Sequence, residues 1–202
     1  MRRIGSQLVV ASHNPGKIVE IGALLAPSGI AALPAGEFGL VAPDETEVSF
    51  AGNARIKAHA AALGSGLPAL SDDSGLCVEA LGGAPGVHTA DWAETGTGRD
   101  FVLAMARLHA EIAASGALEP HRATFVCALC LAWPDGEDRV FEGRVEGRVI
   151  WPMRGTRGFG FDPVFVPEGH MLTFGEMAPE EKDAISHRAV AFRKLANACL
   201  GG

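Results

Sequence analysis

The sequence predicts an α/β fold in which helices flank a mixed central β-sheet. Short apolar stretches typical of strands alternate along the chain with amphipathic helical stretches, and turns rich in Gly and Pro separate them. A Pro-Asp-Gly turn lies between two further strands, which adds an antiparallel pair to the sheet. The 202 residues contain no linker or internal repeat, so we expect one domain over residues 1–202.

The chain up to residue 73 predicts three strands and two helices. In order, we expect a strand, a helix, a short strand within an irregular stretch, a second helix and a third strand, over residues 8–11, 17–26, 27–48, 49–64 and 68–73. The first helix carries apolar residues at helical spacing and ends before Pro27. Ser49 is a typical N-cap for the second helix, and Gly64 is a typical end.

The rest of the chain predicts two more helices and three more strands. Residues 98–114 have a clear amphipathic helical pattern, and residues 121–150 predict two strands around the Pro-Asp-Gly turn. Residues 155–169 predict a loop that contains a short strand. We expect one last helix that begins near Pro179 and continues to residue 200.

Composition and charge exclude several classes of function. The formal net charge of −7 argues against a non-specific nucleic-acid ligand or an anionic membrane. No apolar run approaches the roughly 20 residues that a membrane-spanning helix needs, and the apolar run near the N-terminus is too short for a signal peptide. We therefore expect a cytoplasmic protein. An acidic protein can still bind a polyphosphate where a metal ion and a few cations reverse the local potential.

Four cysteines are too few for a disulfide scaffold, and two of them, Cys127 and Cys130, are predicted to be buried thiols rather than a zinc site. Cys127 and Cys130 have CxxC spacing, but they lie within an apolar, β-branched and aromatic run without turn residues. Because a strand directs residues i and i+3 to opposite faces, these two thiols should point into different parts of the core. Zinc or redox chemistry remains the alternative.

Two polar segments offer positive charge for phosphate. Residues 12–17 form a turn between a strand and a helix, where backbone N–H groups and the side chain of Lys17 favour an anion, although the spacing is not that of a Walker A loop. Asn53 and Lys57 share one face of the second helix, at i and i+4. Read alone, the first segment is an ordinary polar turn and the second a solvated pair.

A third segment places two aspartates side by side at the edge of an apolar stretch. Carboxylates that converge from separate segments can hold Mg²⁺, which also neutralises phosphate oxygens, and the acidic run at residues 43–47 lies upstream. The alternative is that Asp72 caps a local turn and that Asp73 is exposed. One cap explains one aspartate only, and the flanking residues are typical of a buried segment.

The fourth segment has two parts, residues 158–165 and 181–190. Flexible glycines around two phenylalanines and an aspartate could bring aromatic faces and a carboxylate against a flat ligand such as a nucleobase. Lys182, His187 and Arg188 add donors for carbonyl or phosphate oxygens. An ordinary surface helix remains the alternative for the second part.

In this order, the segments resemble the inosine triphosphate pyrophosphatase family, the non-canonical purine nucleoside triphosphate pyrophosphatases. The matching stretches are Ser12-x-Asn14-x-x-Lys17, Phe50-x-x-Asn53-Ala54-x-x-Lys57-Ala58, "SDDSGLCVEALGGAPGV", "GFGFDPVF" and "EKDAISHR". The resemblance implies Mg²⁺-dependent hydrolysis of ITP, dITP and XTP to the monophosphate and pyrophosphate, by a homodimer that clears deaminated purines. It also implies an elongated, two-lobed domain with a substrate cleft between the lobes.

The resemblance also implies roles for individual residues. Asp73 corresponds to the catalytic base and metal-associated group, and Glu45 to the second carboxylate that holds Mg²⁺. The implied substrate contacts are Ser12, His13, Asn14, Pro15, Gly16, Lys17, Lys57, Ser74, Phe159, Gly160, Phe161, Asp162, Lys182, His187 and Arg188.

Two positions depart from the family pattern. Glu47 stands where the family commonly has Gly, which leaves open which of Asp44, Glu45 and Glu47 takes the metal. Asp91 stands where the family usually has Arg, and Arg99 is a candidate substitute for that cation. Two other functions stay open: a related pyrophosphatase that acts on pyrimidine or modified nucleotides, and a nucleotide-binding regulator without catalysis. The doubled aspartate and the upstream glutamate argue against the regulator.

Overall fold

The fold is built on a mixed six-stranded sheet, as expected. The computed structural model describes residues 4–200, and its strand order is β2-β1-β3-β6-β7-β8. The strands are β1 (Gln7–Ala11), β2 (Ala31–Pro34), β3 (Ala69–Val78), β6 (His121–Ala132), β7 (Asp138–Val149) and β8 (Phe165–Pro167). β1 pairs in parallel with β2 and with β3, whereas β7 pairs antiparallel with β8, so the sheet is mixed. The predicted α/β class is therefore confirmed.

Five α-helices accompany this sheet within the described residues 4–200. They are α1 (Pro15–Leu25), α2 (Phe50–Ser65), α3 (Phe101–Ser115), α4 (Pro179–Ile185) and α5 (His187–Leu195). Each of the first three helices begins at a capping side chain: the side chains of Asn14, Ser49 and Asp100 accept hydrogen bonds from backbone N–H groups in the first turn. A two-stranded sheet, β4 (Glu94–Thr95) and β5 (Gly98–Arg99), precedes α3. No helix in the described part is long and apolar enough to cross a membrane.

Backbone contacts divide the chain into two compact units. Within the described part, unit 1 contains residues 4–73, 127–143 and 188–200, and unit 2 contains residues 74–126 and 144–187. Strands β3, β6 and β7 contribute residues to both units. The single domain over residues 1–202 and the substrate cleft stay predictions.

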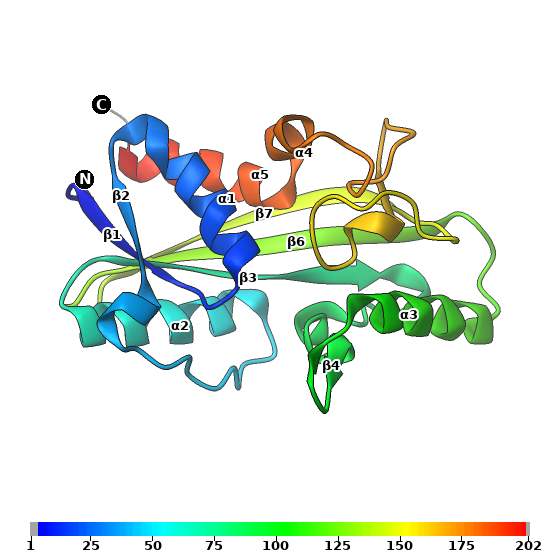
Figure 1. Cartoon of the computed structure of the whole chain (residues 1–202), viewed down its shortest axis with the longest axis horizontal. Helices are drawn as coiled ribbons and strands as arrows, with labels where there is room; N and C mark the ends of the chain where they lie inside the picture. Colours follow the sequence, from blue (N-terminus) through cyan, green and yellow to red (C-terminus); the bar gives the residue numbers. More distant parts are fainter. Residues whose placement is uncertain (1–3, 201–202) are drawn as a thin grey trace. The chain divides into compact units, whose positions relative to one another are not determined.

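The core of unit 1 has two apolar layers, one on each face of its strands. Alternating residues of β1 explain the division, because Leu8 and Val10 belong to one cluster and Val9 and Ala11 to the other. The first cluster includes large residues of α1 and α5. The second is dominated by alanines, four of which come from α2: Ala54, Ala58, Ala61 and Ala62. In Figure 1, α1 and α5 accordingly lie on one side of β1 and α2 lies on the other. Small residues let α2 approach the strands closely.

Unit 2 has one apolar core, which contains many aromatic rings. Phe125 of β6 packs edge-to-face on Phe165, with ring centroids 4.6 Å apart, and Phe174 lies against both rings. Buried residues of α3, among them Leu108 and Ile112, complete the cluster. This core holds the loop of residues 158–165 against the strands of the same unit.

Three expectations about secondary structure need correction. The third strand does not stop at the doubled aspartate but continues to Val78, so Asp72 and Asp73 lie within a strand and not in a turn. The second helix runs past Gly64, and Gly66 ends it in the left-handed conformation. The last helix is broken after Ile185, because Ser186 has an extended backbone with ψ of 156°.

The prediction of separated, buried thiols is confirmed. Cys127 lies in the cluster under α1 and α5, and Cys130 lies in the cluster under α2. Burial raises the pKa of Cys127 well above its usual value and raises the pKa of Cys130 to about 12. None of the four cysteines forms a disulfide, and no group of three or more metal-binding side chains occurs among residues 4–200.

Candidate active site

The alternation of β3 places its two adjacent aspartates on opposite faces of the strand. Ser71 and Asp73 face α2, since the Ser71 hydroxyl donates to the Ala54 carbonyl at 2.6 Å and Asp73 pairs with Lys57. Asp72 faces the other way, toward α1 and α5. The repulsion expected of neighbouring carboxylates is therefore reduced by separation, and each aspartate has its own set of partners.

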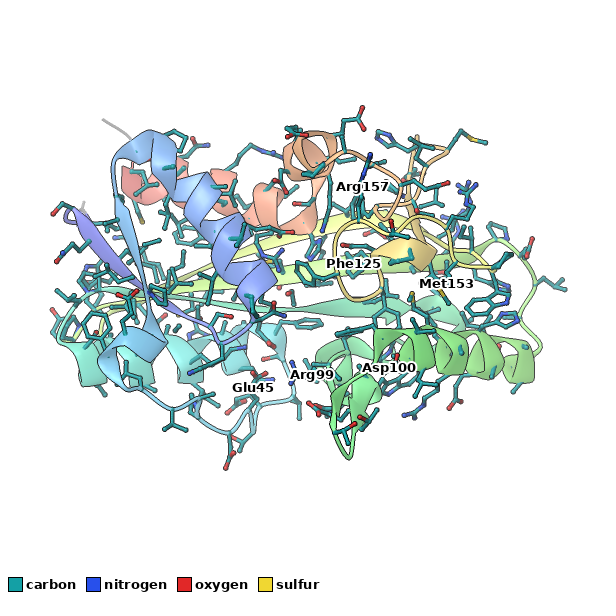
Figure 2. The ribbon with its side chains drawn as sticks, viewed as in Figure 1. Glu45, Arg99, Asp100, Phe125, Met153 and Arg157 are labelled. Atoms are coloured by element: carbon teal, nitrogen blue, oxygen red, sulfur yellow. The ribbon has the colours of Figure 1, made fainter. Side chains whose placement is uncertain are left out.

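Asp73 shares one lysine with Glu45. The Lys57 Nζ atom lies 2.9 Å from Asp73 Oδ1 and 2.9 Å from Glu45 Oε1. Glu45 comes from the loop that precedes α2 (Figure 2), and its side chain is 41% exposed, whereas that of Asp73 is 7% exposed. The second oxygen of Asp73, Oδ2, is buried and has no hydrogen-bond partner among residues 4–200. Buried carboxylate oxygens are normally satisfied, so this atom indicates a missing ligand.

The protonation equilibria at this cluster follow from burial and from Lys57. Burial raises the pKa of Asp73 to about 6, and the nearby Glu45 carboxylate adds to that rise while Lys57 opposes it. For Glu45, Lys57 outweighs burial, and the pKa is lowered. The two carboxylates likewise outweigh burial at Lys57, and the pKa of that ammonium is raised. Asp73 is thus the member of the cluster that can exchange a proton near neutral pH.

The Asp73 cluster fits a magnesium ion. Mg²⁺ is usually bound through one or two carboxylates together with water and substrate phosphates. Asp73 and Glu45 converge on the same ammonium, and the unsatisfied Oδ2 of Asp73 offers a free ligand position. Glu45 is the member of the acidic run that reaches Lys57, whereas the backbone N–H of Glu47 donates to Asn53 Oδ1 at 2.9 Å. The geometry favours Glu45 as the second carboxylate.

Asp72, by contrast, forms ion pairs with two basic side chains, Lys17 and Arg188. Lys17 Nζ lies 2.5 Å from its Oδ1, and Arg188 Nε lies 2.7 Å from its Oδ2. Arg188 also pairs with Glu20 of α1, and the Cys127 thiol donates to Asp72 Oδ2 at 3.1 Å. Burial disfavours the charged carboxylate, but Arg188 and Lys17 outweigh it and hold the pKa of Asp72 well below its usual range. Asp72 is therefore a structural anion that cross-links α1, β3 and α5 of unit 1.

The predicted phosphate-binding turn at residues 12–17 is largely engaged in capping α1. Asn14 Oδ1 accepts from the N–H groups of Gly16 and Lys17, and Ser12 Oγ accepts from Asn14 N. Pro15 occupies the first helical turn. His13 is exposed, and its ring forms a hydrogen bond with the Leu40 carbonyl. Two of the N–H groups that could bind phosphate thus already have an acceptor, which leaves Lys17 as the charged group of this turn.

A second polar cluster lies in unit 2. Lys182 Nζ donates to Asp162 Oδ2 at 2.7 Å, and the same oxygen accepts from Phe159 N at 2.8 Å. Lys182 and Asp162 are both almost fully buried, and the ammonium lies 4.9 Å from the centre of the half-buried Phe159 ring. Gly158 is required beside them, because a Cβ there would lie 2.1 Å from Asp162 Oδ2. The chain therefore holds a buried ion pair under an accessible aromatic ring.

Other predicted contact residues have different surroundings. Phe161 is buried in the apolar core and packs edge-to-face on Phe101, so its ring is a core group. His187 is also buried and stacks on Phe125, which Figure 2 labels on β6, with ring centroids 4.8 Å apart. Ser74 and Gly160 are half-buried, next to Asp73 and Phe161 in sequence.

Asp91, the second position that departs from the family pattern, lies in unit 2, as does its candidate substitute Arg99. Asp91 is exposed and pairs with His88 at 2.8 Å. Arg99, labelled beside Asp100 at the start of α3 in Figure 2, donates to Glu94 at 2.7 Å across the β4–β5 pair. Arg99 as a substitute for the missing cation stays a prediction.

Comparison with known proteins identifies the family. The model of the Ham1 family matches residues 8–198. The chain belongs to the Ham1 family. This Ham1 chain is 57% identical to the dITP/XTP pyrophosphatase of Ruegeria pomeroyi, over 98% of this chain and 97% of the relative, and 56% identical to that of Rhizobium meliloti over the full length of both. The resemblance found in the sequence is thereby confirmed.

Solved structures of the family have the same fold as this Ham1 chain. A HAM1 protein from Coxiella burnetii superposes with a TM-score of 0.87 at 35% identity, over 96% of this chain and 98% of the other. A nucleoside-triphosphatase / dITP/XTP pyrophosphatase from Mycobacterium abscessus superposes with a TM-score of 0.73 at 39% identity, over 95% and 98%. The α/β architecture is thus shared along nearly the whole chain.

Sequence reasoning missed two residues of the Asp72 network in this Ham1 chain: Glu20, which pairs with Arg188, and Cys127, which donates to Asp72. Glu20 follows Lys17 by three residues on the same face of α1, a spacing that could have indicated that both belong to one polar cluster. Cys127 offered no such signal, because its bond to Asp72 joins strands that are 55 residues apart in the sequence.

Proposed function

We propose that this protein hydrolyses non-canonical purine nucleoside triphosphates, namely ITP, dITP and XTP, to the nucleoside monophosphate and pyrophosphate. Relatives that are more than half identical over the whole chain carry the name dITP/XTP pyrophosphatase. The observation that carries the proposal is the Asp73 cluster, in which a buried carboxylate oxygen without a partner lies beside Lys57 and Glu45. In the cell, this activity removes deaminated purines from the nucleotide pool.

In the proposed reaction, Asp73 accepts a proton from water. The water oxygen attacks the α-phosphorus, the bond between that phosphorus and the oxygen bridging to the β-phosphate breaks, and pyrophosphate leaves with the electron pair. A carboxylate whose pKa is about 6 is mostly ionised at neutral pH yet still basic enough to take the proton. Lys57 and Lys17 supply positive charge for the phosphate oxygens.

We further propose Mg²⁺ as the cofactor, held by Asp73 and Glu45. When bound, the ion neutralises charge on the phosphates and on the leaving pyrophosphate. The support is the fit of two carboxylates and one unsatisfied oxygen to the ligand preferences of this metal. Lys57 would keep both carboxylates oriented before the ion arrives.

The cluster of Phe159, Asp162 and Lys182 is our candidate for the purine. The Phe159 ring offers a stacking surface, and Lys182 offers a donor for the oxygen at the purine 6-position. Adenine presents an amino group at that position, so a buried donor would be left facing another donor. Unpaired buried groups allow strong rejection of an analogue.

A substrate panel with Mg²⁺ tests the proposed function. We expect release of pyrophosphate from ITP, dITP and XTP, with ATP and dTTP turned over far more slowly. Asp73→Asn is the matched control, since it keeps the shape of the side chain and removes the basic oxygen. Preference for a pyrimidine or modified nucleotide would support the related pyrophosphatase instead, and binding without turnover of any triphosphate would support the regulator.

The assembly and location follow as finer proposals. We propose a homodimer in the cytoplasm, on the basis of the family resemblance and the absence of any membrane-spanning helix among residues 4–200. Sedimentation equilibrium at micromolar concentration tests the dimer, and fractionation of cells tests the location.

A further inference from the structure

The carboxylate Glu45 is carried by a loop that has no regular secondary structure of its own. Residues 40–47 belong to no helix or strand, and most of them are exposed. A flexible loop loses conformational entropy when it is fixed in one arrangement, at about 1–2 kcal/mol for each residue. Glu45 nevertheless lies within hydrogen-bond distance of Lys57. Something besides this exposed ion pair must hold the loop in place.

The side chain of Asn53 anchors the loop close to Glu45, whereas His13 binds it further away, at the Leu40 carbonyl. Asn53 lies in the first turn of α2 and is 2% exposed. Its Oδ1 atom accepts a hydrogen bond of 2.9 Å from the backbone N–H of Glu47, two residues beyond Glu45. A buried side-chain acceptor that binds loop backbone fixes the path of the chain, and not merely one side chain.

Gly52 gives the loop room to reach this anchor. A Cβ atom at Gly52 would lie 2.6 Å from Cβ and 2.7 Å from Cγ of Glu47, both closer than real Cβ contacts allow. It would also lie 3.0 Å from the Oγ atom of Ser49, which caps the helix. The Glu47 side chain thus packs directly over the helix backbone at Gly52, where α2 presents no side chain.

We propose that Asn53 is a positioning residue for metal binding, and that Gly52 completes its seat. Asn53 acts through the Glu47 backbone to hold Glu45 opposite Lys57 and Asp73. Lys57 lies one turn further along α2, at i+4 from Asn53, so one helix face supplies both the anchor of the loop and the cation that its carboxylate meets. This inference rests on the proposed function, because the metal is part of it. Groups that orient metal ligands typically change affinity or activity by about 10–100-fold when removed.

The first test removes the acceptor. In Asn53→Ala, we expect hydrogen exchange of the Glu47 amide in the metal-free protein to accelerate by about tenfold or more, since the bond to Oδ1 is lost. We expect the Mg²⁺ concentration for half-maximal pyrophosphate release to rise by about tenfold or more, with kcat at saturating Mg²⁺ within about threefold of the wild type. Asn53→Asp retains the acceptor oxygen and should restore the protection of the amide.

The second test moves the loop without removing a hydrogen-bonding group. Gly52→Ala adds the Cβ that Glu47 excludes, and we expect the same rise in the Mg²⁺ requirement. Alanine is favoured over glycine inside a helix by about 1 kcal/mol, so this variant should fold even if Asn53→Ala does not. Gly22→Ala is the matched control, because Gly22 lies inside α1 with nothing within 4 Å of the added Cβ, and its Mg²⁺ requirement should stay at the wild-type value.

The outcomes separate this inference from the function on which it rests. An unchanged Mg²⁺ requirement in Asn53→Ala or Gly52→Ala would overturn the positioning role, whatever happens to stability. If the wild type releases no pyrophosphate from any triphosphate, the proposed function fails by itself. In that case, binding of Mn²⁺ to the nucleotide-free protein, followed by water-proton relaxation, still decides the anchor: affinity lowered in both variants supports it, and equal affinity refutes it.

Discussion

The two neighbouring aspartates of β3 occupy opposite faces of one strand, and their pKa values are shifted in opposite directions. Asp72 is paired with Lys17 and Arg188 and accepts a hydrogen bond from Cys127, and its pKa is held well below the usual range. Asp73 shares Lys57 with Glu45, keeps one buried oxygen without a partner, and has its pKa raised to about 6. A satisfied buried charge stabilises a fold, whereas an unsatisfied one indicates a place for a ligand.

The largest effect should come from removing the unsatisfied carboxylate. We expect Asp73→Asn to lower kcat for ITP by about 10²–10⁴-fold, because it removes the proposed base and one proposed metal ligand. The measurement is pyrophosphate release at saturating Mg²⁺. Circular dichroism serves as the control and should be unchanged. Near-normal turnover in this variant would show that Asp73 has no role in catalysis, and the functional difference between the two aspartates would then be refuted.

Replacement of the satisfied carboxylate should instead damage the fold. Asp72→Asn leaves the buried Arg188 and the half-buried Lys17 against a neutral amide, and breaking a buried pair from one side costs about 3–5 kcal/mol. Urea denaturation at about pH 7 measures this loss. The stabilisation by Asp72 is fully present above its unfolded pKa of about 4 and is lost as the pH falls toward the lowered folded pKa. The difference between the variant and the wild type should therefore shrink in acid, and a difference that is the same at every pH would contradict the ion-pair explanation.

The pH dependence of stability should have the opposite sign at Asp73. A folded pKa of about 6 lies above the unfolded value of about 4, so the folded state binds the proton more tightly, and this contribution to stability falls as the pH rises from about 4 to about 6. Above about pH 6, the penalty is on the order of 2–3 kcal/mol. In EDTA, Asp73→Asn should therefore be more stable than the wild type at about pH 8 and equal to it at about pH 4. A less stable variant at about pH 8 would mean that Lys57 outweighs burial at this carboxylate.

The sequence could predict the elements but not which partner each aspartate finds. The apolar run at residues 8–11, the helical spacing of apolar residues in the first helix and the cap at Ser49 are local signals, and they predicted a strand and two helices correctly. The continuation of β3 beyond Asp73 to Val78 was missed, because adjacent carboxylates are typical of turns when their partners are unknown. Those partners come from helices and strands that are distant in the sequence, so the local sequence pattern could not predict them.

The break between α4 and α5 was missed for a related reason. The stretch from Pro179 onward has uninterrupted helical propensity, with neither Gly nor Pro near Ser186. The residues that follow the extended backbone at Ser186 contact different parts of the chain: His187 stacks on Phe125, and Arg188 pairs with Asp72. Tertiary contacts of two buried polar residues have overridden local propensity here.

The smallest effect we expect compares two cysteines that lie on the two faces of β6. Cys127→Ser places a stronger donor against Asp72 Oδ2, so the free energy of unfolding should change by less than about 1 kcal/mol. Cys130→Ser buries a hydroxyl in the alanine-rich cluster under α2, which costs about 1–3 kcal/mol where no acceptor compensates it. Parallel urea titrations measure both. A buried hydroxyl should be tolerated only where a buried charge accepts its hydrogen bond. Equal losses of unfolding free energy in the two variants would therefore show that the two faces of β6 do not differ in polarity.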